Sequence, residues 1–230
     1  MPEDPKELWY FDVERNFRAW TLQDYLRYFE PASTQTAIGE ATPGYLWCAP
    51  EHSSWGSPSH FRTGIPHRVH SALGSGVKLI AVLRDPVTRA LSAFLHHRRK
   101  GRIPENAMLS PHYQQDGIVH MGFYSAHLAR WTETFPKENF KVVTYEELFF
   151  NPETLEKLQS FLNVHPLAPE ELRNKRVNEG FGFHFDRNGV VDSAGVRIAT
   201  DEDIHFLRQT YASDTKQLVQ DWGIDVGTWM

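Results

Sequence analysis

The chain has 230 residues, a hydrophobic content of 40% and an aromatic content of 13%, which suits a single domain with a buried core. Its formal net charge of −5 argues against a general nucleic-acid-binding protein, and no apolar stretch is long enough to span a membrane. The charged first residues do not form a secretory signal, and Cys48 is the only cysteine, so no internal disulfide is possible and we expect a cytoplasmic location.

The first notable segment, residues 6–12, has the sequence KELWYFD and surrounds a carboxylate with aromatic side chains. A carboxylate in such a pocket can have a raised pKa and act as a general base, which makes Glu7 a candidate. The residue types alone favour a simpler alternative, a surface glutamate at the start of an edge strand. An amphipathic helix is predicted next, over residues 20–29, by four apolar side chains at helical spacing, Leu22, Tyr25, Leu26 and Phe29.

A turn is predicted over residues 39–46, GEATPGYL, because of its glycines and proline. Glu40 in this turn is either a second carboxylate of a site or a cap of a helix or turn, and both alternatives stay open. Residues 47–64 are predicted to be a loop, and residues 65–70 begin a short helix.

The central stretch of the chain is predicted to be a strand followed by a helix. The apolar run LIAVL at residues 79–83 predicts a buried strand. Pro86 suits the first turn of a helix, and Asp85 suits its cap. The helix is supported by apolar residues at helical spacing, Val87, Ala90, Leu91, Phe94 and Leu95.

This junction is a candidate anion site. A helix N-terminus offers unpaired backbone N–H groups and the positive end of the helix dipole. Arg84 adds a guanidinium, which is well suited to phosphate, and Ser92 lies about two turns along the helix. The alternative is a structural strand–helix unit in which Arg84 pairs with a carboxylate.

The helix end is followed by a basic run, HHRRKGR at residues 96–102. These cations either complement the helix dipole or form a rim that attracts an anionic substrate. The chain contains no H-E-x-x-H or C-x-x-C motif, so we expect no metal ion.

The second half of the chain alternates between predicted helices and strands. A helix is expected over residues 122–135, a buried strand over 140–144 and a helix after Asn151 and Pro152. Residues 163–199 show little periodicity. The closing helix is expected over residues 201–222.

Several of these segments together resemble PAPS-dependent sulfotransferases. The order L-R-D-P-x-x-R-A-x-S at residues 83–92 resembles the family segment that holds the 3′-phosphate of the sulfate donor. The N-terminal K-E-x-x-[FY]-F-D resembles the heparan-sulfate branch, and GEATPGYL resembles a segment that lines the acceptor cleft. The run Y-E-x-L followed by N-P and a helix also resembles the family.

The resemblance implies roles for individual residues. Arg84 and Ser92 would bind the 3′-phosphate, and Glu7 would be the catalytic base. The acceptor would be bound by Lys6, Trp9, Asp12 and Glu40. A loop that closes over the nucleotide would contribute Ser193, Gly195 and Arg197. The chain departs from the family pattern at Trp9, where relatives often have histidine, and at Ala41, where many have lysine.

The implied fold is α/β, a P-loop-NTPase-like three-layer fold with a central parallel sheet flanked by helices. The family's phosphate loop, of the type K-x-G-T/S-[ST], does not occur in the sequence. We therefore expect one sulfotransferase-like domain over residues 1–230 that is N-terminally incomplete and lacks the first strand and this loop.

The implied function is transfer of a sulfuryl group from PAPS to a hydroxyl or amine of a carbohydrate or small molecule. The alternative is a catalytically inactive protein that binds PAP or another nucleotide or a partner. A nucleotide-kinase-like enzyme is a weaker alternative, since no Walker lysine is present.

Overall fold

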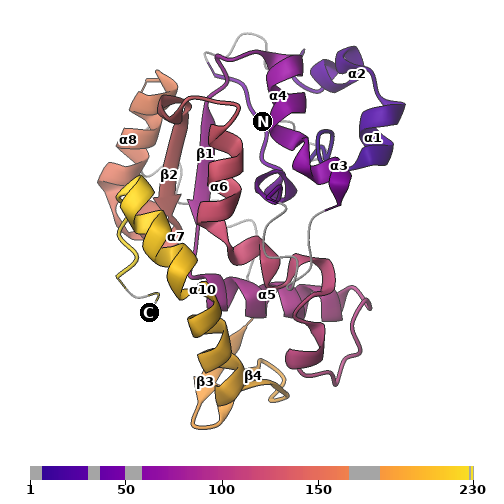
Figure 1. Ribbon diagram of the computed structural model, residues 1–230, viewed down its shortest axis with the longest axis vertical. Coiled ribbons are helices and arrows are strands. Elements are labelled where there is room, and N and C mark those ends of the chain that lie inside the picture. The colour runs from indigo at the N-terminus through magenta and orange to yellow at the C-terminus, as the bar shows by residue number, and fades with distance from the viewer. Residues whose placement is uncertain (1–6, 31–36, 50–58, 166–181, 228, 230) are drawn as a thin grey trace.

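The computed structural model describes residues 7–30, 37–49, 59–165, 182–227 and 229. Its helices and strands (Figure 1) are α1 Glu14–Ala19, α2 Leu22–Arg27, α3 His60–Thr63, α4 Ile65–Leu73, β1 Leu79–Leu83, α5 Pro86–Arg99, α6 Tyr124–Thr132, β2 Phe140–Thr144, α7 Tyr145–Phe150, α8 Pro152–Leu162, β3 Phe183–Asp186, β4 Gly189–Asp192, β5 Arg197–Thr200 and α10 Asp201–Trp222. Short 3-10 turns connect several of these elements.

The parallel pair β1 and β2 organises the fold, and its register aligns Leu79 with Phe140 and Leu83 with Thr144. Figure 1 shows α8 beside the pair, α6 against it and α5 below the carboxyl end of β1. The α/β fold and the strands at residues 79–83 and 140–144 are therefore confirmed.

One face of β1 is more open than the sequence predicts. Leu79 and Ala81 pack against a buried core, whereas the side chains of Ile80 and Val82 are 42% and 47% exposed. Parallel strands are usually covered on both faces, which is why their sequences are continuously apolar. An apolar run thus identifies the strand, but the prediction that it is fully buried is wrong for this face.

Two apolar cores divide the described residues. The first joins the N-terminal segment, α6, β1, β2 and the end of α10, and includes Leu8, Phe11, Tyr25, Leu83, Leu128 and Trp131. The second joins α5, α10 and the β4–β5 strands, and includes Leu91, Phe94, Val190, Ile198, Leu207 and Tyr211. Because α5 and α10 both contribute to the second core, the helix that begins at the strand–helix junction is packed along its length against buried side chains.

Helix α5 begins where the sequence predicts. The carboxylate of Asp85 accepts a hydrogen bond of 2.9 Å from the backbone N–H of Val87, and Pro86 occupies the first turn. Helix α10 spans Asp201–Trp222 as expected, and begins with reciprocal hydrogen bonds between Thr200 and Asp203. Leu128, Trp131 and Phe135 are buried as predicted, although α6 is shorter than the expected helix.

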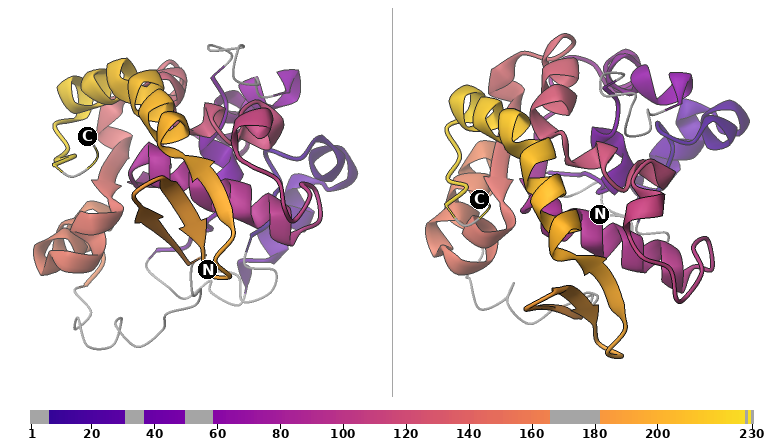
Figure 2. Two further views of the ribbon diagram at one scale, coloured as in Figure 1. Left: turned by 90° about the horizontal axis from the view of Figure 1, so that it is seen from below. Right: turned by 60° about the horizontal axis from the view of Figure 1, so that its bottom comes forward.

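One expectation was wrong in part. Of the helix predicted over residues 20–29 only α2 forms, and Leu22 and Leu26 are exposed at 36% and 38%, so Tyr25 and Phe29 carry the predicted apolar contacts. The stretch with little periodicity contains a small sheet that the sequence analysis did not predict: residues 183–200 form the antiparallel sheet β3–β4–β5 beside α10 (Figure 2). Its strands have four residues each, too few for alternation to be recognised.

Candidate functional site

The strand–helix junction presents a cation without a carboxylate partner. Arg84 directly follows β1 and is half-buried, and its guanidinium forms no hydrogen bond or ion pair with any described residue. Its carbonyl oxygen accepts a hydrogen bond of 3.0 Å from the Tyr124 hydroxyl, which fixes the backbone. The alternative, that Arg84 forms an ion pair with a carboxylate, is not observed within the described residues, although Asp85 is near enough for Arg84 to act on its pKa.

The electrostatics of the junction favour an anion. Burial raises the pKa of Asp85, while backbone N–H groups and the nearby cations Arg84 and Arg208 act in the opposite direction. The carboxylate of Asp85 is already engaged by the N–H of Val87. The guanidinium groups of Arg84 and Arg208 and the N-terminal end of the 14-residue helix α5 therefore contribute positive charge at this junction, and the Asp85 carboxylate already accepts a hydrogen bond there.

Ser92 lies on α5, and Glu7 lies near the same helix. Ser92 is half-buried on α5, and His96 follows one turn later. Burial and the neighbouring cations lower the pKa of His96, and Glu7 lies close enough to act in the opposite direction. The structure thus brings the predicted base near the same helix that carries the predicted phosphate ligands.

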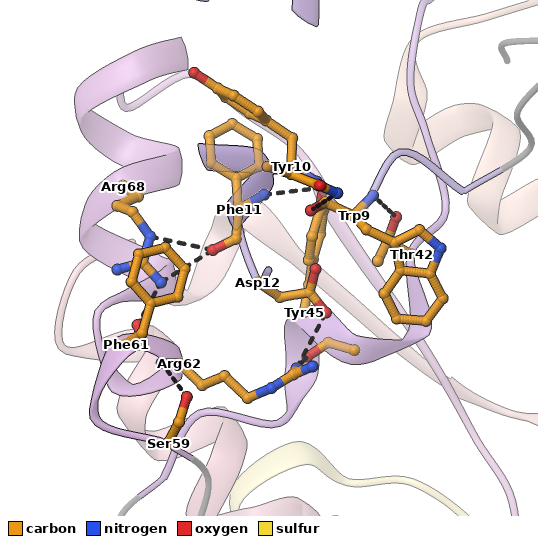
Figure 3. Close-up of polar contacts among 12 residues, drawn as sticks. Trp9, Tyr10, Phe11, Asp12, Thr42, Tyr45, Ser59, Phe61, Arg62 and Arg68 are labelled. Atoms are coloured by element: carbon orange, nitrogen blue, oxygen red, sulfur yellow. Dashed lines mark hydrogen bonds and ion pairs between the residues drawn. The ribbon is translucent and has the colours of Figure 1, made fainter. Parts of the chain in front are cut away.

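The segment that carries Glu7 is an irregular turn rather than an edge strand. Trp9 has a left-handed backbone with φ of 53°. Its N–H donates to the Thr42 hydroxyl at 3.4 Å, and its carbonyl accepts from the Asn16 side chain at 3.1 Å. The N–H groups of Tyr10 and Phe11 both donate to the Tyr45 hydroxyl, at 3.2 and 3.4 Å (Figure 3). Side chains, and not a strand ladder, hold this turn.

Glu40 supports that turn indirectly. Its carboxylate accepts hydrogen bonds from the hydroxyls of Tyr25 at 2.9 Å, Thr42 at 2.9 Å and Tyr45 at 2.8 Å. Burial and this carboxylate raise the pKa of both tyrosines. All three partners are hydroxyls, so Glu40 does not cap a backbone turn. A role for Glu40 in acceptor binding stays a prediction.

Asp12 is buried and engaged. Its fully buried carboxylate forms an ion pair of 3.0 Å with Arg62, which also donates to the carbonyl of Gly44 at 3.0 Å (Figure 3). Burial raises the pKa of Asp12, against the effect of Arg62. A Cβ at Gly44 would lie 2.1 Å from Oδ2 of Asp12, so only glycine fits there. A contact between Asp12 and an acceptor stays a prediction.

The predicted closing loop lies in the turn between β4 and β5. Gly195 has φ of 81°, and the N–H of Ser193 donates to Gly182. Arg197 forms two hydrogen bonds with Asp186, at 2.9 and 2.7 Å, and lowers the pKa of Asp186 to about 2. These residues therefore already have intramolecular contacts, and donor binding by them stays a prediction.

The closing turn is nevertheless attached to α5. Arg98 on α5 forms an ion pair of 3.3 Å with Asp192 at the end of β4, and both side chains are mostly buried. The turn therefore lies at the far end of the helix that begins at the anion site. Lys6, predicted to bind the acceptor, lies outside the described residues.

Sequence reasoning missed Arg62, which lies within the stretch predicted to be a loop. Its partners Asp12 and Gly44 are 50 and 18 positions away, so no local pattern indicates the pairing. Within the described residues, no group of three or more histidine, cysteine or acidic side chains could hold a metal ion. None of the helices in this part of the chain has the length and apolar content of a membrane span.

The fold and site together define a class of protein. A parallel α/β sheet in which a strand ends at a helix N-terminus, beside an arginine that forms no ion pair with a described residue, is an arrangement that suits a phosphorylated ligand. The comparisons identify the family, because the model of the sulfotransferase domain matches residues 52–180, more than half of the chain. The chain belongs to the sulfotransferase family, as its sequence motifs predict.

The relatives include carbohydrate sulfotransferases. The human heparan sulfate glucosamine 3-O-sulfotransferase 5 is 30% identical over 151 residues, which are 59% of this chain and 42% of that protein. The human bifunctional heparan sulfate N-deacetylase/N-sulfotransferase 2 is 28% identical over 141 residues, 55% of this chain and 16% of that protein. The chain thus spans less than half the length of these curated relatives.

A solved structure shares the fold. The sulfotransferase from Alicyclobacillus acidocaldarius matches with a TM-score of 0.65 and 20% identity, and the match covers 98% of this chain and 86% of that one.

Proposed function

We propose that the protein transfers a sulfuryl group from PAPS to a hydroxyl or amine of a carbohydrate. The observation that carries this proposal is the half-buried Arg84, which has no carboxylate partner among the described residues, at the start of α5. An unpaired guanidinium at a helix N-terminus suits a phosphate dianion, such as the 3′-phosphate of PAPS. The names of the relatives support a saccharide acceptor, and a small-molecule hydroxyl is the alternative.

In this proposal, each residue has one task. Arg84 and Ser92 hold the 3′-phosphate and so orient the donor for in-line transfer. Glu7 takes the proton from the acceptor as its oxygen or nitrogen forms a bond to sulfur. The bond between sulfur and the bridging oxygen breaks, and PAP leaves with the electron pair. Cations near that oxygen stabilise the charge that develops on PAP.

The sequence also supports a second candidate function. The 230 residues contain no K-x-G-T/S-[ST] loop, which in the family binds the 5′-phosphosulfate and supplies a lysine to the leaving group. A protein with the Arg84 site but without that lysine would bind PAP and not turn over PAPS. Binding and turnover must therefore be measured separately.

The test begins with calorimetric titration of PAP. We expect Arg84→Ala to weaken PAP binding at least tenfold, because a charge-assisted contact to phosphate is lost. The matched control is Arg27→Ala on α2, an arginine that is exposed to solvent and, among the described residues, pairs with Asp24. Equal affinity of the Arg84→Ala and Arg27→Ala variants would refute the anion site.

The second measurement is transfer from labelled PAPS to a panel of saccharides and phenols. We expect Glu7→Gln to abolish transfer and to leave PAP affinity unchanged. Transfer by the Glu7→Gln variant would exclude Glu7 as the base. PAP binding without transfer by the wild type would favour the nucleotide-binding alternative.

A further inference from the structure

A second group of cations lies beside Phe11, in the turn that follows Glu7. A hollow of about 580 Å³ lies among α1, α3, the start of α4 and α6, and is lined by Glu14, Arg18, Phe61, Gly64, Arg68 and Arg130. Three guanidinium groups therefore line the hollow with a single carboxylate. A concave surface with this charge balance attracts anions.

Arg68 is the cation at the base of this hollow. Its guanidinium donates to the carbonyl oxygen of Phe11 at 3.1 and 2.9 Å and also to that of Phe61 (Figure 3). It lies 3.6 Å from the centre of the Phe61 ring. No carboxylate pairs with Arg68 among the described residues, and burial lowers its pKa to about 10. The carboxylates of Asp12 and Glu14 act on the pKa of Arg68 in the opposite direction from burial, but neither forms an ion pair with it, and the direct hydrogen-bond partners of its guanidinium are neutral carbonyls.

The other two arginines are on the rim. Arg18 is 75% exposed and pairs with Glu14 one turn earlier on α1, a contact that solvent weakens. Arg130 pairs with the exposed Glu133 on α6, and its remaining N–H groups reach the Thr63 carbonyl only at 3.4 Å. The exposed Arg18 side chain is free to turn toward an anion, and the long contacts of Arg130 with Thr63 are weak.

The backbone of the hollow is also favourable. Helix α4 has nine residues, and no side chain caps its N-terminus at Gly64. A Cβ at Gly64 would lie 2.8 Å from a terminal nitrogen of Arg68, so glycine allows the guanidinium to lie against the helix start. The positive end of the helix dipole and the Arg68 charge therefore lie together.

The hollow is within reach of the proposed base. Arg68 donates hydrogen bonds to Phe11. Phe11 is four positions from Glu7, so the Cα atoms of Phe11 and Glu7 are at most roughly 14 Å apart. An oligosaccharide of a few sugar units covers such a distance.

We propose that this arginine hollow binds an anionic group of the saccharide acceptor, a carboxylate or a sulfate ester, while the reacting hydroxyl or amine lies at Glu7. The proposal rests on the proposed function, because it names the charge of the acceptor for the same reaction. It assigns selection for acidic saccharides to Arg18, Arg68 and Arg130, none of which contacts the donor site.

The test is titration of the protein with a sulfated heparin hexasaccharide in the presence of PAP. We expect the double variant Arg18→Ala/Arg130→Ala to bind the hexasaccharide at least tenfold more weakly at low salt. Arg15→Ala is the matched control, since Arg15 is exposed on the same helix α1 but does not line the hollow, and it should change binding less than twofold. A neutral hexasaccharide should not distinguish the double variant from the wild type.

Two further variants guard against loss of folding. Arg130→Lys keeps the charge and should retain most of the affinity, and Gly64→Ala should weaken binding because it displaces the Arg68 guanidinium. Unaltered hexasaccharide binding by a folded Arg18→Ala/Arg130→Ala variant would overturn the proposal, even if sulfate transfer were demonstrated. Weaker binding in that variant would support the hollow even if no transfer were found, so the two proposals fail separately.

Discussion

The ion pair between Asp12 and Arg62 offers the sharpest test of how the N-terminal turn is held. Arg62→Met would keep most of the side-chain volume but leave the fully buried Asp12 carboxylate without its cation. Removing one partner of a buried pair typically costs about 3–5 kcal/mol. In a domain of this size 1 kcal/mol shifts Tm by roughly 2–4 °C, so we expect a fall of roughly 6–20 °C at pH 7.

The destabilisation caused by Arg62→Met should depend on pH, and the direction of this dependence follows from the pKa of Asp12. Burial raises the pKa of Asp12 in the folded chain, and Arg62 opposes that rise, so the pKa is higher still in the variant. A group with a raised folded pKa favours folding at low pH and loses that contribution as pH rises through the folded pKa. The cost of Arg62→Met should therefore be largest at pH 7–8 and shrink toward pH 4.

The assay is urea unfolding of both proteins at pH 7 and pH 5, with Asp12→Asn added to the variant as the control. The neutral amide should recover much of the stability that Arg62→Met removes at pH 7. A cost below about 1 kcal/mol at pH 7, or an equal cost at both pH values, would refute the reasoning.

Two other predictions concern the β3–β4–β5 sheet. Arg197→Ala should return the pKa of Asp186 from about 2 toward its ordinary value, which NMR titration would show. In the wild type, the Arg197–Asp186 pair should stabilise the fold above pH 4, and this stabilisation should be lost as pH falls toward 2. A fall in PAP affinity in the same variant would support donor binding by Arg197, and unchanged affinity would contradict it. Gly189→Ala should destabilise the fold by about 3 kcal/mol or more, because φ is 132° and a Cβ would lie 2.1 Å from the Ala199 carbonyl oxygen. Gly223→Ala, at φ of 62° in open space, should cost only about 1–2 kcal/mol in the same melts, and similar costs at the two positions would contradict this account.

The elements that the sequence predicts well are those whose determinants are local. The strand at residues 79–83 is an uninterrupted apolar run, and the start of α5 is indicated by the adjacent cap residue Asp85 and first-turn residue Pro86. Helix α10 has apolar residues at helical spacing over six turns and a Thr200–Asp203 cap. In each case, neighbours in the sequence supply both the pattern and the hydrogen bonds.

The parts that could not be predicted depend on partners that are distant in sequence. Arg68 meets Phe11 across 57 positions, and Arg62 meets Asp12 across 50. No local pattern predicts either contact, so the hollow and the buried pair emerge only from the fold. The exposure of Ile80 and Val82 has the same cause, because coverage of a strand depends on what packs there and not on the strand itself.

These distant contacts also explain how the proposed base is positioned. Residues 7–12 have no strand ladder, so their conformation depends on single side-chain bonds, each of which contributes about 1 kcal/mol. Tyr45 and Thr42 hold the N–H groups of the turn, and Glu40 holds their hydroxyls. Arg68 holds the following carbonyl and also lines the arginine hollow. An acceptor charge bound at that hollow would therefore act on the same turn that presents Glu7, which couples acceptor binding to the position of the base through one short stretch of backbone.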